Sequence, residues 1–135
     1  MSVSNLIAAG VYSKLSGGTA LIALLGGTAI YRDIAPKDIA YPYIVFRPLA
    51  GGPDNMTPSD SRTLVYSVIA YAHDKGQAGS IDASVSSLLH RQAITVTGYT
   101  NYWLARETEI NLVEQPPDAE IVFASGAQYR IRIDS

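Results

Sequence analysis

The stretch from Ile30 to Phe46 decides the fold. It reads Ile30-Tyr31-Arg32-Asp33-Ile34-Ala35-Pro36 and, after a short polar spacer, Tyr41-Pro42-Tyr43-Ile44-Val45-Phe46. The first part predicts a short strand over 30–34 that Pro36 ends. The second part predicts a strand over 43–49, in which Tyr43, Val45 and Arg47 line one face and the alternate residues line the other. Pro42 fits at the entry to this strand, where its missing amide costs little.

Two short helices are expected upstream of this stretch. Apolar residues recur at intervals of three and four, which places on one helical face Val3, Leu6, Ile7, Gly10, Val11 and Leu15. Ser2 or Ser4 can cap the start, and Gly17-Gly18 is expected to end the helix in a left-handed conformation. A second helix over 20–25, capped by Thr19, would stop at Gly26-Gly27. The repeated Gly-Gly-Thr-Ala lacks the Gly-Lys-Ser/Thr of a phosphate loop, so its glycines are interpreted as marking the ends of helices.

Downstream of Phe46 the sequence predicts a long loop, a central strand and one helix. Two glycines and two prolines between Ala50 and Ser61 predict a loop, which is long for a hairpin. The run over 62–72 is β-branched and apolar on both alternating faces, as in a central strand covered on both sides. Residues 74–79 break this pattern. An amphipathic helix then extends to about His90, defined by Ile81, Val85, Leu88 and Leu89.

The C-terminal third predicts strands over 93–97, 102–113, 121–124 and 129–133. Pro116-Pro117-Asp118 predicts a turn, and Ser125-Gly126-Ala127 is either a turn or a bulge. The succession of hairpin-like strands favours antiparallel pairing of 43–49 with 62–72 and of 102–113 with 121–133. We therefore expect a single α+β domain over 1–135. It has N-terminal helices, then a mostly antiparallel sheet with one inserted amphipathic helix packed on it.

The short strand, the proline turn and the Tyr41-Pro42-Tyr43 entry into an aromatic, β-branched strand resemble the small tail-completion (tail terminator) proteins of long-tailed bacteriophages. The resemblance covers nearly the whole chain in element order. It implies a small sheet with helices packed on it. It also implies a hexameric ring at the head-proximal end of the tail, with DNA passing through a central channel without specific binding.

Composition narrows the classes of function. The chain has 135 residues and no cysteine, which excludes disulfides, thiolate metal sites and cysteine nucleophiles and fits assembly in the reducing host cytoplasm. A net charge of −2 gives no basic footprint for tight nucleic-acid binding. Apolar runs are too short for a membrane span, and the N-terminus lacks the basic region of a signal peptide. Charged residues make up only 16%, which favours a surface partly covered by other subunits over a polar monomer.

The sequence offers no catalytic, cofactor or metal constellation. The two histidines, His73 and His90, sit at the ends of a strand and a helix, and His90 is interpreted as a helix C-terminal cap. His73-Asp74 could orient an imidazole, but no exposed serine elbow accompanies them. His73, Asp74 and Asp82 lack a recognised metal-ligand spacing. We therefore expect no enzyme activity and no cofactor.

The predicted subunit interface combines strand charges with a loop. Glu107 and Glu109 would share one strand face with Trp103, and Arg130 and Arg132 could sit opposite the two glutamates. Either these charges pair within one subunit or they pair between neighbours, and Trp103 is either a lid on a local core or an interface anchor. The loop over 50–61 is expected to protrude and contact a neighbour through Pro53, Asp54, Asn55 and Met56.

The leading hypothesis for function is a structural assembly protein, a tail terminator ring subunit that caps the tail tube and joins it to the head. Its partners would be further copies of the chain, the tail tube protein and a head-completion or neck protein, at the tail-neck junction of the virion. A head-completion or connector protein is the nearest alternative. A small cellular α+β ligand-binding domain or enzyme is the other, and it would need a pocket with convergent polar groups.

Overall fold

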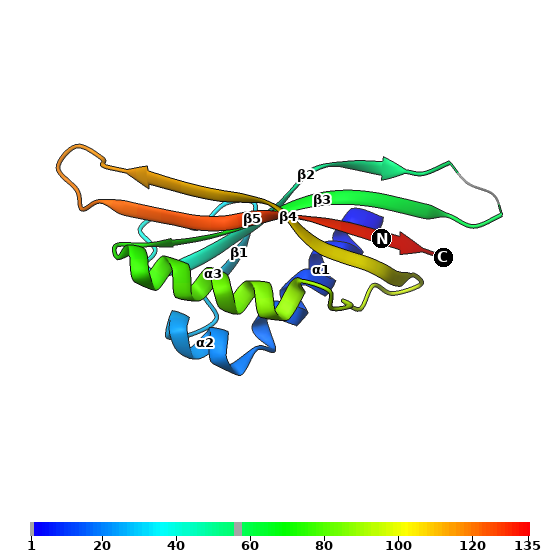
Figure 1. Ribbon diagram of the computed structural model, residues 1–135, viewed down its shortest axis with the longest axis horizontal. Helices are drawn as coiled ribbons and strands as arrows, with labels where there is room; N and C mark the ends of the chain where they lie inside the picture. Colours follow the sequence, from blue (N-terminus) through cyan, green and yellow to red (C-terminus); the bar gives the residue numbers. More distant parts are fainter. Residues whose placement is uncertain (1, 56–57) are drawn as a thin grey trace.

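The computed structural model describes residues 2–55 and 58–135. Figure 1 shows helices on one side of a twisted sheet, from which two hairpins project in opposite directions. The elements follow in the order α1 (Val3–Ser16), α2 (Thr19–Leu25), β1 (Ile30–Arg32), β2 (Tyr43–Pro53), β3 (Ser61–Ala72), α3 (Lys75–Leu89), β4 (Thr100–Glu114) and β5 (Val122–Asp134).

The strands form one five-stranded sheet in the order β1-β2-β3-β5-β4. β1 runs parallel to β2, with Ile30 opposite Ile44, and the other neighbours are antiparallel. The predicted α+β class is confirmed, as is the antiparallel pairing within the two hairpins. β1 is shorter than the expected strand over 30–34, because Asp33 has φ 68° and so turns the chain out of the strand before Pro36.

The helices α1, α2 and α3 lie on the same face of the sheet (Figure 1). The core between the layers contains, as its largest fully buried side chains, Tyr66, Tyr129, Phe46, Ile7, Leu15, Leu21, Ile44, Ile81, Leu89, Ile131, Ile133 and Val11. β3 is central in the sheet, as predicted, but the expectation that it is covered on both sides is wrong. Within the described residues no helix covers the other face, where Val65, Ile69 and Tyr71 are only half-buried. We call this uncovered side the open face.

The ends of α1 and α2 differ in part from the expected glycine geometry. Ser2 caps α1, since its hydroxyl accepts a hydrogen bond from the Asn5 amide at 3.2 Å. Gly17 is right-handed at φ −80° rather than left-handed. Gly18, not Thr19, is the N-cap of α2, and a Cβ there would lie 2.5 Å from the Leu88 side chain. Glycine at 18 therefore allows close packing against α3, while Gly26 ends α2 at φ 75° as predicted.

Residues 74–79 end the strand pattern as expected, since β3 stops at Ala72, but they already belong to the next helix: α3 begins at Lys75, several residues before the apolar positions that predicted it. Asp74 is its N-cap, and its carboxylate accepts a hydrogen bond from the Gln77 amide at 2.9 Å. The cap satisfies an orphan amide of the first turn. It allows the glycines at 76 and 79 to be helical despite their low propensity.

The hairpin of β2 and β3 is longer than predicted, because residues 50–53 of the expected loop over 50–61 belong to β2 and Ser61 belongs to β3. β2 continues to Pro53, with a register shift between Pro48 and Ala50. β1 pairs only with Ile44, Val45 and Phe46, so this part of β2 is at the sheet edge. Prolines are tolerated on an edge because no ladder hydrogen bond is lost there.

Two further predictions from the C-terminal third are wrong. Residues 93–97 form an isolated bridge between Val96 and Tyr99 rather than a strand. Ser125-Gly126-Ala127 is neither a turn nor a bulge, because β5 runs without interruption and pairs with β3 in register from Phe123 to Asp134. The irregularities are on β4, between Asn101 and Trp103 and between Arg106 and Glu109.

Gly126→Ala tests the close approach of β5 to β3. A Cβ at Gly126 would lie 2.3 Å from the Val68 carbonyl oxygen, so the strands must separate to admit it. We expect a loss of about 1–3 kcal/mol in the free energy of unfolding, measured by urea denaturation. Gly79→Ala in α3, where a Cβ meets nothing within 4 Å, is the matched control and should stabilise by about 0.5–1 kcal/mol. Equal effects of the two changes would contradict the close approach.

Candidate functional site

The open face carries the basic and aromatic residues that the sequence singled out on β4 and β5. Arg132 lies opposite Trp103, and Arg130 lies opposite Ala105. Directly opposed residues share a face of an antiparallel sheet. The alternate residues of β5, Tyr129 and Ile131, are buried under the helices, so Arg130, Arg132 and Trp103 lie on the open face.

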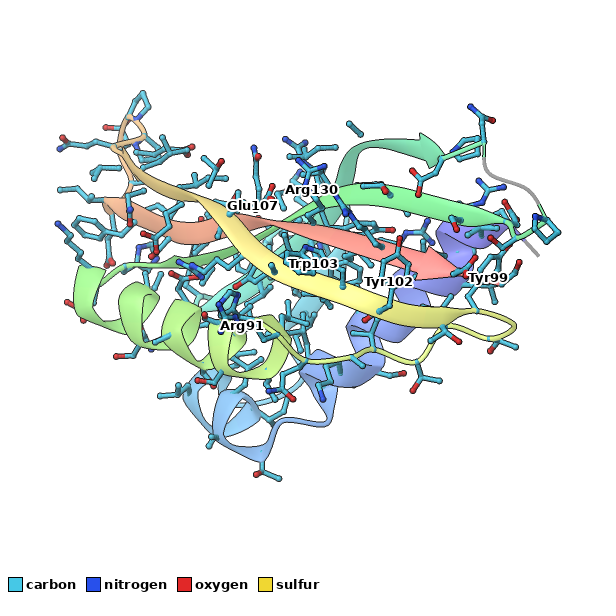
Figure 2. All side chains as sticks on the ribbon, turned by 45° about the vertical axis from the view of Figure 1, so that its right-hand side comes forward. Arg91, Tyr99, Tyr102, Trp103, Glu107 and Arg130 are labelled. Carbon is cyan, nitrogen blue, oxygen red and sulfur yellow. The ribbon has the colours of Figure 1, made fainter. Side chains whose placement is uncertain are left out.

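Trp103 and Arg132 form an exposed aromatic and basic pair. Trp103 is 49% exposed, and the Arg132 guanidinium carbon lies 5.9 Å from its ring centroid. The Asn101 amide donates to the carbonyls of Trp103 and Arg132 at 2.9 and 3.0 Å, which fixes the bulge where Tyr102 is the extra residue. The bulge presents Tyr102 and Trp103 beside each other on the surface (Figure 2). About half of Trp103 is therefore accessible to a neighbouring molecule.

Glu107 and Arg130 pair within one chain. The Arg130 Nε donates to both carboxylate oxygens of Glu107, at 3.0 and 3.1 Å, and the two side chains lie together in Figure 2. The hydrogen bonds to Glu107 raise the pKa of Arg130. The pair is partly exposed, so it contributes little to folding. It remains accessible to a neighbouring molecule.

Glu109 does not share a face with Glu107, contrary to the prediction. Two residues of β4, Glu107 and Thr108, oppose the single residue Gln128 of β5, and this bulge reverses the alternation beyond it. Glu109 instead turns to the helix side, where its carboxylate accepts from Arg106 at 2.8 Å. Arg132 therefore faces Trp103 rather than Glu109.

Arg106 joins β4 to α3 and β5. Its guanidinium donates to both carboxylate oxygens of Asp82, at 2.9 and 2.6 Å, and to the Tyr129 hydroxyl at 3.0 Å. The hydrogen bonds to Asp82 are the main cause that raises the pKa of Arg106, and those to Glu109 act in the same direction. Asp82 is only 9% exposed. Sequence reasoning missed this network, although both charges occupy positions on the otherwise apolar faces of α3 and β4, which was the available signal.

Each histidine has a structural contact. The His90 Nδ1 accepts a hydrogen bond from the Arg106 amide at 3.0 Å, so it satisfies an edge amide of β4 in addition to capping α3. The His73 Nδ1 lies 3.0 Å from the Ile121 carbonyl oxygen, and its ring packs 4.2 Å from that of Tyr41. Asp74 caps α3 and does not orient His73. The arrangement provides no Ser-His-Asp geometry around the described histidines.

The described residues contain no group of three His, Cys, Asp or Glu side chains that could hold a metal ion. Asp74 binds the start of α3 and Asp82 binds Arg106, so these carboxylates do not converge with His73. No single helix among the described residues is long and apolar enough to cross a membrane. Only α1 and α2 together have the length and apolar composition of a membrane span, and they are bent by 81° relative to each other.

The tip of the β2–β3 hairpin holds the predicted loop residues Pro53, Asp54 and Asn55, while Met56 lies outside the described residues. Asp54 is bound across the hairpin, where its carboxylate accepts from the Thr63 hydroxyl at 2.9 Å and its amide donates to the Ser61 carbonyl at 2.8 Å. The hairpin projects away from the helix layer (Figure 1). Pro53 and Asn55 are exposed there.

Arg106→Leu tests whether the Asp82 network stabilises the fold. The change leaves a buried carboxylate without its partner, so we expect a loss of about 3–5 kcal/mol in the free energy of unfolding, measured by chemical denaturation. The double variant Arg106→Leu/Asp82→Leu removes both charges and should recover a large part of that loss. If the double variant is no more stable than Arg106→Leu, the cost does not come from an unpaired Asp82.

Comparison with known proteins identifies the family. The family model described as "Tail completion protein gp17" matches residues 9–134. A solved chain from the structure titled "Virion of native gene transfer agent (GTA) particle" is 18% identical with a TM-score of 0.81, over 99% of this chain and 98% of that chain. A second solved chain is 17% identical with a TM-score of 0.60, over 97% and 96%. At such identities both show a shared fold. No curated protein matches the sequence. The resemblance seen in the sequence is thereby confirmed, and the chain belongs to the tail completion protein gp17 family, a family of structural proteins of phage tails.

Proposed function

We propose that the protein is a tail terminator, a ring subunit that caps the growing tail tube and joins it to the head. The family description, tail completion, supports a role at the end of tail assembly. The fold is shared with a chain of a gene transfer agent virion. This role is one of binding and geometry, without bond chemistry or a cofactor.

The observation that carries the proposal is the open face. A sheet with helices on only one side leaves the half-buried Val65, Ile69 and Tyr71 and the exposed Trp103 without cover in the single chain. Apolar and aromatic residues left uncovered on a sheet face are candidates for an interaction site. The proposed partners are further copies of the chain in a hexameric ring, the tail tube protein and a head-completion or neck protein, at the tail-neck junction of the virion. Assembly would take place in the cytoplasm of the host, with DNA passing through the ring without specific binding.

The proposed interface comprises Trp103, Arg132, Arg130 and Glu107 on the open face, and Pro53, Asp54, Asn55 and Met56 at the hairpin tip. Complementary charges at an interface fix register and reject wrong partners more than they add affinity. Arg130 is already held by Glu107 in a defined orientation. Glu109 contributes to this surface only indirectly, because it binds Arg106 on the helix side.

Removal of the gene separates the terminator from its nearest rival, a head-completion protein. Without a terminator, nothing stops tube growth, so we expect tails of uncontrolled length that do not join heads, measured by electron microscopy of lysates. Supplying the chain from a plasmid should restore a single tail length. Tails of normal length beside unjoined heads would favour the head-completion role and contradict the terminator role.

Trp103→Ser tests the open-face interface. Because Trp103 is half-exposed, the thermal midpoint of the isolated protein should change little, while the yield of completed tails should fall at least about tenfold, as for a hot-spot residue. Leu24→Ser on α2, where Leu24 is 40% exposed in the helix layer, is the matched control and should complete tails normally. Normal completion by folded Trp103→Ser would remove Trp103 from the interface.

The reversal Arg130→Glu gives a second test of the same surface. We expect a folded protein that fails to complete tails, since a like charge would then face Glu107 and any partner carboxylate. Adding Glu107→Arg restores the pair with its signs exchanged. If the double variant recovers folding stability but not tail completion, the charges act between molecules. If it recovers both, they act only within the chain. Glu109 is left unchanged, because Arg at 109 would repel Arg106.

A further inference from the structure

A groove crosses the open face near the end of β3 that is remote from Trp103. It has a volume of about 720 Å³. Tyr43 and Val45 of β2 and Tyr71 of β3 line it from the sheet, and Asp33, Asp38 and neighbouring residues line it from the segment between β1 and β2. Glu114, at the end of β4, also lines it. The groove therefore joins residues from β2, β3, β4 and the segment after β1.

Tyrosine rings form the aromatic part of this groove. Tyr43 stacks on Tyr71 with ring centroids 5.2 Å apart, and Tyr41 packs against Tyr43 at 5.0 Å. Tyr31 meets the edge of Tyr43 at 6.2 Å. Burial raises the pKa of Tyr43 and of Tyr71, and Glu114 acts in the same direction on both. The phenols are therefore neutral, and the tyrosine cluster brings electron-rich aromatic rings to the groove without a negative charge of its own.

The charged residues that line the groove all carry the same sign. They are Asp33, Asp38 and Glu114, and the described lining includes no Lys or Arg. Arg32 approaches Asp33 only to 3.8 Å, and both side chains are exposed. Asp33 and Asp38 have φ of 68° and 61°, so the backbone holds both in a left-handed conformation. Carboxylates and tyrosine rings thus line the same groove.

We propose that this groove binds an arginine or lysine side chain presented by a partner protein. A guanidinium or ammonium group over a tyrosine face is attracted by the ring, and the carboxylates of the groove supply ion pairs and hydrogen bonds. An apolar side chain would desolvate three carboxylates without compensation, and an anion would be repelled. The inference deepens the proposed function by giving the chemistry of one partner, but its test needs no tail.

A peptide titration of the full chain tests the groove directly. The probe is the acetylated and amidated tripeptide Gly-Arg-Gly, and the matched neutral probe is Gly-Gln-Gly. The ring signals of Tyr43 and Tyr71, followed by NMR on protein with labelled tyrosine, should shift saturably with the arginine peptide only, and less at high salt. No saturable shift, or equal shifts with both peptides, would overturn the proposal.

Charge-neutral variants locate the binding. Asp33→Asn, Asp38→Asn and Glu114→Gln keep the shapes of the side chains, and Asn tolerates the left-handed backbone at 33 and 38. The triple variant should bind the peptide more weakly, with a dissociation constant raised at least about tenfold. Asp118→Asn, at φ 60° in the β4–β5 turn and outside the groove, is the matched control and should change nothing. Unchanged affinity in the folded triple variant would overturn the site.

Three further results decide between a second copy and a partner segment, and separate this inference from the proposed function. Tyrosine shifts that grow with protein concentration in the absence of peptide would assign the groove to a second copy of the chain and overturn the proposal of a partner segment. Peptide binding by a protein whose loss leaves tail length normal would keep the groove and reject the terminator role. If loss of the protein gives tails of uncontrolled length but the protein binds no peptide, the terminator role is kept and the groove proposal is rejected.

Discussion

The fold depends on the burial of two tyrosines, Tyr66 on β3 and Tyr129 on β5, which lie directly opposite each other at the centre of the sheet. They are the largest fully buried side chains, and each needs a partner for its hydroxyl. Tyr66 reaches the Ser4 carbonyl of α1 at 3.5 Å, and Tyr129 accepts from Arg106 at 3.0 Å. Because both phenols are satisfied on the helix side, the helices are fixed to that side, and the other face of the sheet stays open.

Alternation of side chains allowed much of the sheet to be predicted from the sequence. It placed Ile44 and Phe46 correctly on the face opposite Tyr43, and it found β3 as the central strand. It failed beyond Glu107, because a β-bulge without Gly or Pro leaves no mark in the sequence yet exchanges the two faces of the strand. The Gly/Pro-rich run after Ala50 led to the opposite error, since a loop was predicted where β2 continues to Pro53. Its residues are compatible with an edge strand, which the sequence pattern alone does not separate from a loop.

The sequence predicted several residues of the candidate site but not most of the side-chain contacts between them. The proximity of Arg130 and Glu107 followed from pairing the last two strands, and the structure confirms it within one chain. The Arg106–Asp82 pair joins residues far apart in sequence, and its recognition required knowing which face of α3 packs on β4. The aromatic groove was missed for a similar reason. It combines Tyr43 and Tyr71 with Glu114, and only the sheet order brings these three strands to one end.

The two ends of the open face differ in charge, and this difference bears on what the protein can join. One end presents Trp103 with Arg132, and the other presents stacked tyrosines bordered by three carboxylates. Aromatic side chains supply binding energy at both ends, so the difference in charge decides which partner each end accepts. In the proposed terminator role, the protein would contact two different neighbours in a fixed order. The exposed tryptophan–arginine pair at one end and the acidic tyrosine groove at the other are chemically different surfaces, so each end would accept a different neighbour.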